Sequence, residues 1–95
     1  MGNCNLSLQV LPVVDNDTLY AVVDRVIEMI DASGFAYTVG PMETTIEGDL
    51  EELLHLVKRA KDVCEEAGVK RMCFVVKIDY SSEGVTIAEK VAKYR

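Results

Sequence analysis

The stretch PMETTIEGDLEELLHLVKRA (Pro41–Ala60) decides the fold, because a turn, a strand and a helix start follow one another within it. Pro41 follows Gly40, and this pair is a strong turn signal. The segment that comes next alternates polar and apolar residues, as a half-buried strand does. From Leu50 onward, apolar residues recur at helical spacing. The stretch therefore predicts the second strand of a β-hairpin that leads directly into a helix.

The segments on either side repeat this pattern of strands and helices. Apolar residues at every second position predict strands over residues 4–11, 35–39, 43–48 and 70–80. Apolar residues three and four apart predict helices over about 17–33 and from Asp49 to the region of Gly68, and a short C-terminal helix over 86–94. Gly34 and Gly68 suit the left-handed residue that closes a helix.

The second helix has two further predicted features. Asp49 caps it, and Glu52 stands three residues later, as a capping box requires. Its buried stripe is expected to consist of Leu50, Leu53, Leu54, Val57, Ala60, Val63 and Cys64.

The order of elements is β-α-β-β-α-β with a terminal helix. Such a split βαβ pattern predicts an α+β, ferredoxin-like sandwich, in which a four-stranded antiparallel sheet carries both helices on one face. The first and third strands are central, and the second and fourth are at the edges. The chain has 95 residues, 49% of them hydrophobic, which suffices for one domain over residues 1–95 with a modest core.

Charge and cysteine content exclude several classes of function. The formal net charge is −6, and an acidic surface repels phosphate backbones, so we expect no nucleic-acid partner. No apolar run is long enough to span a membrane. Cys4, Cys64 and Cys73 form no CxxC pair and follow no secretory signal, which favours free thiols and a cytoplasmic protein. With His55 they make a poor ligand set, so no metal and no cofactor are expected.

Two-residue periodicity divides the strands into a helix-facing side and an open side. The helix-facing side is apolar: Leu6, Leu8, Val10, Phe35, Tyr37, Val39, Ile46, Met72, Phe74, Val76 and Ile78. The open side is mostly polar: Asn5, Ser7, Gln9, Thr38, Glu43, Thr45, Glu47, Cys73, Val75, Lys77 and Asp79. Such a face is a wetted surface, a subunit interface or a ligand site, and the pattern alone leaves the three open.

No catalytic residue is predicted. His55 is expected on the exposed side of a helix, so no Ser-His-Asp or Cys-His arrangement is indicated. Glu43 and Glu47 lie on one strand face about 13 Å apart in an ideal strand. That separation is too large for joint action on one bond. These observations favour a binding protein or an interaction module over an enzyme.

Several short motifs resemble those of a known family: Gly40-Pro41-Met42, Thr45-Ile46-Glu47-Gly48 and Lys77-Ile78-Asp79. Over nearly the whole chain, the sequence is similar to the thiamine-binding family of small ferredoxin-like proteins, also called the YkoF-like or UPF0045 group. The resemblance implies binding of thiamine or its hydroxymethylpyrimidine portion without turnover. It also implies a homodimer or homotetramer built by sheet pairing and sheet stacking.

The predicted ligand site combines this resemblance with the open sheet face. An aminopyrimidine offers donor and acceptor edges that carboxylates and hydroxyls match, and a thiazolium cation suits an acidic pocket. Glu47 is the first choice for the amino edge, because a carboxylate accepts two hydrogen bonds. The residues expected near the ligand, or at a subunit seam that completes its pocket, are Thr45, Glu47, Lys77, Asp79, Ser7 and Thr38.

Three features depart from the family pattern. Glu43 stands where a small residue is usual, Ser81 stands where an arginine is usual, and the loop VVDNDT after the first strand lacks a common glycine. These differences bear on the identity of the ligand rather than on the fold.

Two other functions remain open. One is a structural oligomerisation module whose polar face assembles subunits without a small-molecule ligand. The other is a small enzyme of acylphosphatase type. That enzyme needs an arginine in a phosphate-binding loop after the first strand, where PVVDND offers two aspartates that repel phosphate.

Overall fold

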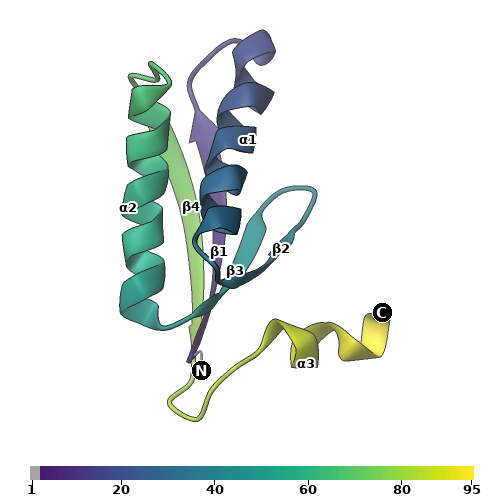
Figure 1. Cartoon of the computed structure of the whole chain (residues 1–95). Coiled ribbons are helices and arrows are strands. Elements are labelled where there is room, and N and C mark those ends of the chain that lie inside the picture. Colours follow the sequence, from purple (N-terminus) through teal and green to yellow (C-terminus); the bar gives the residue numbers. More distant parts are fainter. Residues whose placement is uncertain (1–2) are drawn as a thin grey trace.

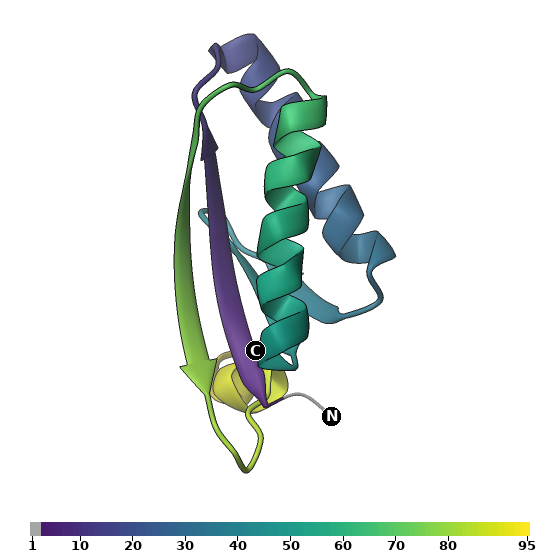
Figure 2. The same ribbon diagram turned by 90° about the vertical axis from the view of Figure 1, so that its left-hand side faces the viewer.

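The computed structural model describes residues 3–95, so Met1 and Gly2 of the predicted domain lie outside the described part. The four strands form one antiparallel sheet in the order β2-β3-β1-β4, and α1 and α2 cover one of its faces (Figures 1 and 2). This arrangement confirms the predicted α+β, ferredoxin-like βαββαβ sandwich with a short C-terminal helix. The elements are β1 (Cys4–Pro12), α1 (Asn16–Ala32), β2 (Ala36–Val39), β3 (Thr44–Gly48), α2 (Leu50–Glu66), β4 (Met72–Tyr80), α3 (Ile87–Val91) and a final 3-10 turn (Ala92–Tyr94).

The hydrophobic core lies between the sheet and the two long helices. The central strands β1 and β3 supply its floor, because their alternate apolar side chains point toward the helices. Each helix turns one apolar stripe inward. The buried apolar residues are Cys4, Leu6, Leu8, Val22, Val26, Met29, Ile30, Ile46, Leu53, Leu56, Ala60, Cys64 and Val69.

The ends of α1 and the close of α2 follow local rules. Asp15 caps α1 by accepting a hydrogen bond from the Thr18 N–H at 2.9 Å. Gly34 and Gly68 have φ angles of +84° and +88° and close the two helices, as predicted. Other residues rarely adopt this backbone conformation, which explains why glycine stands at both positions.

The capping box predicted for α2 is wrong. Asp49 occupies the N-cap position, but its side chain makes no capping hydrogen bond. Instead, the Asn3 side chain accepts a hydrogen bond from the Leu50 N–H at 3.3 Å. A residue from the start of the chain therefore performs the task that a local residue was expected to perform.

The buried stripe of α2 also differs from the prediction. Leu54 is 46% exposed, whereas Leu56, which the prediction omitted, is 1% exposed. Consecutive residues of a helix point about 100° apart, so Leu53 and Leu54 cannot both face the core. The helix buries Leu53 and Leu56 and leaves Leu54 in solvent.

At the sheet edges, the helix-facing side is incompletely covered. Val39 on β2 and Val76 and Ile78 on β4 were expected in the core, yet they are 49%, 36% and 46% exposed. Their neighbours across the strands confirm the predicted side, since Leu6 pairs with Ile78 and Leu8 with Val76. The two helices pack mainly over the central strands, so the helix layer is narrower than the sheet.

Beyond β4 the chain leaves the sandwich. Residues 81–84 form a turn closed by a hydrogen bond from the Gly84 N–H to the Ser81 carbonyl at 3.0 Å. Residues 85–95, which we call the tail, then lie at the end of the sheet where β1 begins (Figures 1 and 2). No residue of α3 is buried, so the tail adds little to the hydrophobic core.

Candidate ligand-binding site on the open sheet face

The strand register arranges the predicted site residues in two rows across the open face. In the first row, Ser7 on β1 lies between Thr45 on β3 and Lys77 on β4. Thr38 on β2 continues this row beyond Thr45 to the edge. Directly opposed residues of an antiparallel pair have Cβ atoms about 4.5–5.5 Å apart. Thr45 and Lys77 therefore lie on opposite sides of β1, and Ser7 lies between them.

In the second row, Asn5 on β1 lies between Glu47 and Asp79. The tail covers this row with one contact to each strand. The Ile87 N–H donates to Glu47 Oε1 at 2.6 Å. Lys90 Nζ forms an ion pair with Asp79 Oδ2 at 2.5 Å.

The third contact of the tail involves the side-chain amide of Asn5. Its Nδ2 group donates to the Cys4 carbonyl at 3.2 Å and to the Val85 carbonyl at 3.5 Å. Two carbonyl acceptors fix the orientation of this amide, because the reversed orientation would turn its oxygen toward them. Asn5 is 3% exposed, and its Oδ1 atom has no hydrogen-bond partner among the described residues.

A shallow hollow lies where the uncovered first row meets the tail. We call it the open-face hollow, and its volume is about 290 Å³. Three strands form its floor and the tail contributes one side. The lining residues are Asn5, Ser7, Glu43, Thr45, Lys77, Ile78, Asp79 and Lys90.

The hollow brings together four of the six predicted site residues: Ser7, Thr45, Lys77 and Asp79. Glu47 does not line it, and one of its oxygens holds the tail. Thr38 lies one strand farther toward the edge.

The prediction omitted four residues that line the hollow: Asn5, Glu43, Ile78 and Lys90. Ile78 was assigned to the helix-facing side. Asn5 and Glu43 were placed on the correct face, but periodicity gives a face and not a position within it. Lys90 belongs to the tail, to which no face was assigned. Had the pairing of β1 with its two neighbouring strands been predicted as well, Asn5 would have been placed between Glu47 and Asp79. It would then have been a candidate site residue.

The chemistry of the hollow is that of polar recognition. It carries two carboxylates and two ammonium groups, and one of each is paired in the contact between Lys90 and Asp79. Hydroxyls and the unpaired amide oxygen complete the set. Groups of both signs, beside hydrogen-bonding groups of fixed orientation, can recognise a small polar molecule without attracting one sign of charge strongly.

The two buried thiols are poorly suited to act as nucleophiles. Burial and the nearby Asp79 carboxylate raise the pKa of the Cys4 thiol, and burial raises the pKa of the Cys64 thiol. Both thiols therefore stay protonated at neutral pH and are weak nucleophiles. Within residues 3–95, no group of three His, Cys, Asp or Glu side chains is placed to hold a metal ion.

Comparison with known proteins identifies relatives along the full chain. The family described as thiamine-binding protein matches residues 6–95. A UPF0045 protein of Clostridium perfringens is 53% identical over 95 residues, which is 100% of each chain.

Two solved structures share the fold closely. A Thermotoga maritima protein provisionally described as acting in thiamine biosynthesis or salvage is 42% identical, with a TM-score of 0.90 over 97% of this chain and 98% of that one. A domain of unknown function from Bacillus cereus is 47% identical, with a TM-score of 0.90 over 97% of this chain and 89% of that one.

Proposed function

Because this chain belongs to the thiamine-binding protein family, to which the UPF0045 name also applies, we propose that it binds thiamine or its hydroxymethylpyrimidine portion in the open-face hollow. The ligand is bound and released unchanged, and no metal or cofactor takes part.

The observation that carries this proposal is the unpaired, buried Oδ1 atom of Asn5, a residue that lines the hollow. A buried acceptor without a partner costs free energy, which a ligand donor recovers. The exocyclic amino group of an aminopyrimidine is such a donor. The Ser7 and Thr45 hydroxyls flank the same floor and can each donate to a ring nitrogen or accept from the amino group.

The remaining predicted residues complete the site in different ways. Lys77 and Asp79 border the hollow, and Glu43 places a carboxylate where a thiazolium cation can meet it. Glu47 acts through the tail, which it holds against the second row. Thr38 extends the first row toward the edge and meets the part of a ligand that projects beyond Thr45.

Calorimetric titration with thiamine and with hydroxymethylpyrimidine tests the proposal. The sharpest variant is Thr45→Val, which removes a hydroxyl from the hollow and keeps the shape of the side chain. Loss of one neutral hydrogen bond weakens binding by about 2- to 10-fold. Thr38→Val is the matched control on the same row and should change the affinity less. Absence of heat with either compound in the folded wild-type protein would refute the proposal.

A second function is favoured by a separate observation on β4. This edge strand has nine residues, and its helix-facing residues Val76, Ile78 and Tyr80 are 36%, 46% and 54% exposed. An unpaired edge with exposed apolar side chains is a template for pairing with another strand. We therefore also propose self-association into a homodimer or homotetramer, which would give the molecule a structural role even without a ligand.

The setting of these functions is proposed from composition. Cys4, Cys64 and Cys73 are all free thiols, as is usual in a reducing compartment, and we place the protein in the cytoplasm. The net charge of −6 argues against a nucleic-acid partner. None of the helices among residues 3–95 has both the length and the apolar character needed to cross a membrane.

A further inference from the structure

The tail is held on the open face by polar contacts rather than by apolar packing. It lies outside the sandwich (Figure 1), no residue of α3 is buried, and Tyr94 near its end is 78% exposed. Within residues 3–95, the hydrogen bonds and ion pairs that join it to the strands are the three described above, with Glu47, Asn5 and Asp79. A segment with so few buried apolar contacts opens at a small free-energy cost.

The turn before the tail supplies a fixed base and a point of rotation. The Ser81 N–H donates to the Asn3 carbonyl at 2.9 Å, which ties the start of the turn to the chain that leads into β1. The Gly84 N–H closes the turn on the Ser81 carbonyl. Gly84 has a φ angle of +100°, a conformation that glycine adopts without steric cost. The chain up to Gly84 is therefore anchored, and the tail can swing as a unit beyond it.

The closed tail buries one polar atom that has no partner. Asn5 is 3% exposed, although α1 and α2 cover the other face of the sheet (Figure 2). Ser7, the next residue of β1 on the same face, is only half-buried, so the cover over Asn5 comes from the tail. The Oδ1 atom of Asn5 has no hydrogen-bond partner among residues 3–95. Burial of this acceptor opposes closure, because water reaches it when the tail is open.

The tail also forms one side of the open-face hollow. Lys90 is paired with Asp79, and both residues line the hollow. Opening of the tail separates this pair and exposes the second row of the open face beside the first row. The position of the tail therefore sets the size of the hollow and the access to it.

We propose that the tail is a releasable strap, held by the Lys90–Asp79 ion pair and the Glu47 hydrogen bond, which opens to admit a ligand and closes when the ligand donates a hydrogen bond to Asn5 Oδ1. A ligand shifts such an equilibrium only by its difference in affinity for the two states. Here the difference arises at Asn5, because the ligand replaces water in the open state but satisfies an unpartnered atom in the closed state. The identity of the ligand rests on the proposed function, whereas the strap itself does not.

Hydrogen exchange detected by NMR on the full chain tests the strap without any ligand. The Lys90 and Asp79 side chains are 43% and 58% exposed, so salt screens their attraction. Raising the NaCl concentration to about 1 M should therefore speed exchange at the Ile87 amide by up to about fivefold. The Gly84 amide lies before the point of rotation and should not respond.

Two lysine variants separate the ion pair from the charge of the tail in general. Lys90→Met should speed exchange at the Ile87 amide at low salt and remove its dependence on NaCl. Lys93→Met is the matched control, since Lys93 belongs to the same tail but does not line the hollow, and it should change neither property. An Ile87 amide that responds neither to NaCl nor to Lys90→Met would overturn the strap.

Asn5→Leu tests the cost of closure, again without a ligand. The substitution removes the unpartnered oxygen, and with it the hydrogen bond to the Val85 carbonyl, which is weak at 3.5 Å. Exchange at the Ile87 amide should slow at least about fivefold, although a contact with the tail has been deleted. Ser7→Leu places the same side chain in the first row and should have a smaller effect. Faster exchange in Asn5→Leu would contradict the role of Asn5.

Thiamine tests the coupling between ligand and strap. Saturating thiamine should slow exchange at the Ile87 amide at least about fivefold. Because coupling is reciprocal, Glu47→Ala should weaken thiamine binding at least about twofold, although Glu47 does not line the hollow. Bound thiamine that leaves the Ile87 amide unchanged would overturn the coupling. A wild type that binds no thiamine would refute the proposed function, and the NaCl, Lys90 and Asn5 measurements would still decide the strap.

Discussion

Ile46 is completely buried, while its neighbours Thr45 and Glu47 lie half-buried on the opposite side of the sheet. Three consecutive residues of one short strand therefore have three different tasks: a hydroxyl for the open face, a methyl-rich side chain for the core, and a carboxylate for the tail. Polar residues stand in this strand because one of its faces lies on the open side of the sheet, where Thr45 lines the hollow and Glu47 accepts a hydrogen bond from the tail.

Truncation of this strand should separate the two faces. Ile46→Ala should reduce the free energy of unfolding by about 2–5 kcal/mol, because it removes buried methyl groups and leaves a cavity. Thr45→Ala should cost little, since the hydroxyl faces the hollow. Urea denaturation followed by circular dichroism measures both values, and similar losses would contradict the observed register.

Gly48 makes a second prediction at the residue scale. A Cβ atom at this position would lie 2.9 Å from Phe35 Cδ1 and 3.2 Å from Leu53 Cδ2. Gly48→Ala should therefore destabilise the protein by about 1–3 kcal/mol, as overpacking does. In a Phe35→Leu background the cost should be smaller, and a double-mutant cycle in urea reports the coupling. If the losses of stability in Gly48→Ala and Phe35→Leu simply add in the double mutant, the contact with Phe35 is not the cause of the destabilisation.

At the scale of elements, hydrophobic periodicity in the sequence was sufficient to predict the strands, the two long helices and their order. It failed at Leu54, where adjacent apolar residues on a helix cannot show which of them faces the core. It also failed at Asp49, because the partner of the Leu50 N–H comes from Asn3, far away in the sequence. The tail contacts were likewise beyond reach, since they join side chains from three strands to one segment and depend on the register between strands.

The tail gives the first prediction at this scale. Glu47→Ala removes the acceptor of the Ile87 N–H, so hydrogen exchange at the Ile87 amide should become faster. Glu43→Ala is the matched control, since it removes a carboxylate on the same face that makes no hydrogen bond to the tail. NMR-detected exchange measures the effect, and an unchanged Ile87 amide would mean that other contacts hold the tail.

The cap of α1 gives a prediction about pH. Hydrogen bonds from Thr18 hold the pKa of Asp15 below its ordinary value of 3.8. A carboxyl group with a lowered pKa in the folded state stabilises the protein above the pKa of the unfolded state, and this contribution is lost as the pH falls through the folded-state pKa. Asp15→Asn keeps a capping oxygen without the charge.

The melting temperatures of the wild type and of Asp15→Asn should therefore differ more at pH 7 than in acid. The wild type should lose its advantage over the variant on acidification. A difference in melting temperature that is independent of pH would show that the charge of Asp15 contributes nothing.

At the scale of the whole molecule, the exposed side of β4 bears on assembly. Ile78→Lys places a charge among the exposed apolar side chains of this edge, and natural edge strands avoid pairing in this way. Light scattering of the wild type should show a species larger than the 10.5 kDa chain, and Ile78→Lys should reduce its mass. Tyr20→Lys, on α1 at a residue that is 74% exposed, should have no effect. A wild type that scatters as a single chain would refute self-association.

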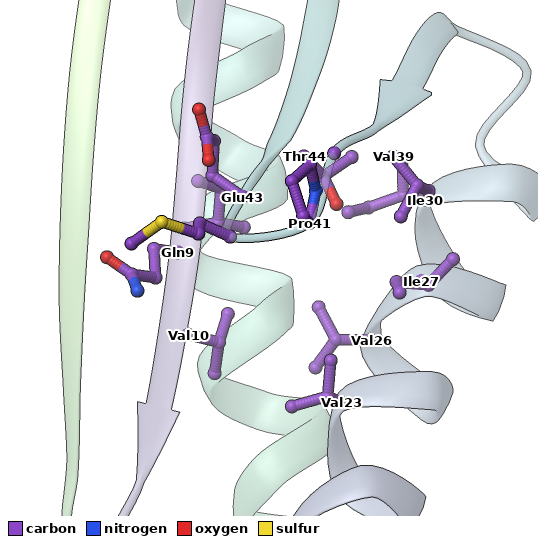
Figure 3. A pocket seen from close by; sticks show the side chains of 13 residues that line it. Gln9, Val10, Val23, Val26, Ile27, Ile30, Val39, Pro41, Glu43 and Thr44 are labelled. Atoms are coloured by element: carbon purple, nitrogen blue, oxygen red, sulfur yellow. The ribbon is translucent and has the colours of Figure 1, made fainter.

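The short hairpin also has a consequence for protein engineering. β3 begins only at Thr44 while β1 continues to Pro12, and a cavity of about 120 Å³ lies between the end of β1, α1 and the hairpin loop (Figure 3). Lengthening β2 and β3 by two residues each would preserve the alternation of faces and set new backbone beside Gln9 and Val10. The insertion would complete the ladder, seal α1 from solvent and stabilise the domain, at the expense of the cavity. Hairpin length is thus a single variable that trades stability against the volume of the cavity, and a graded series of insertions would measure that exchange.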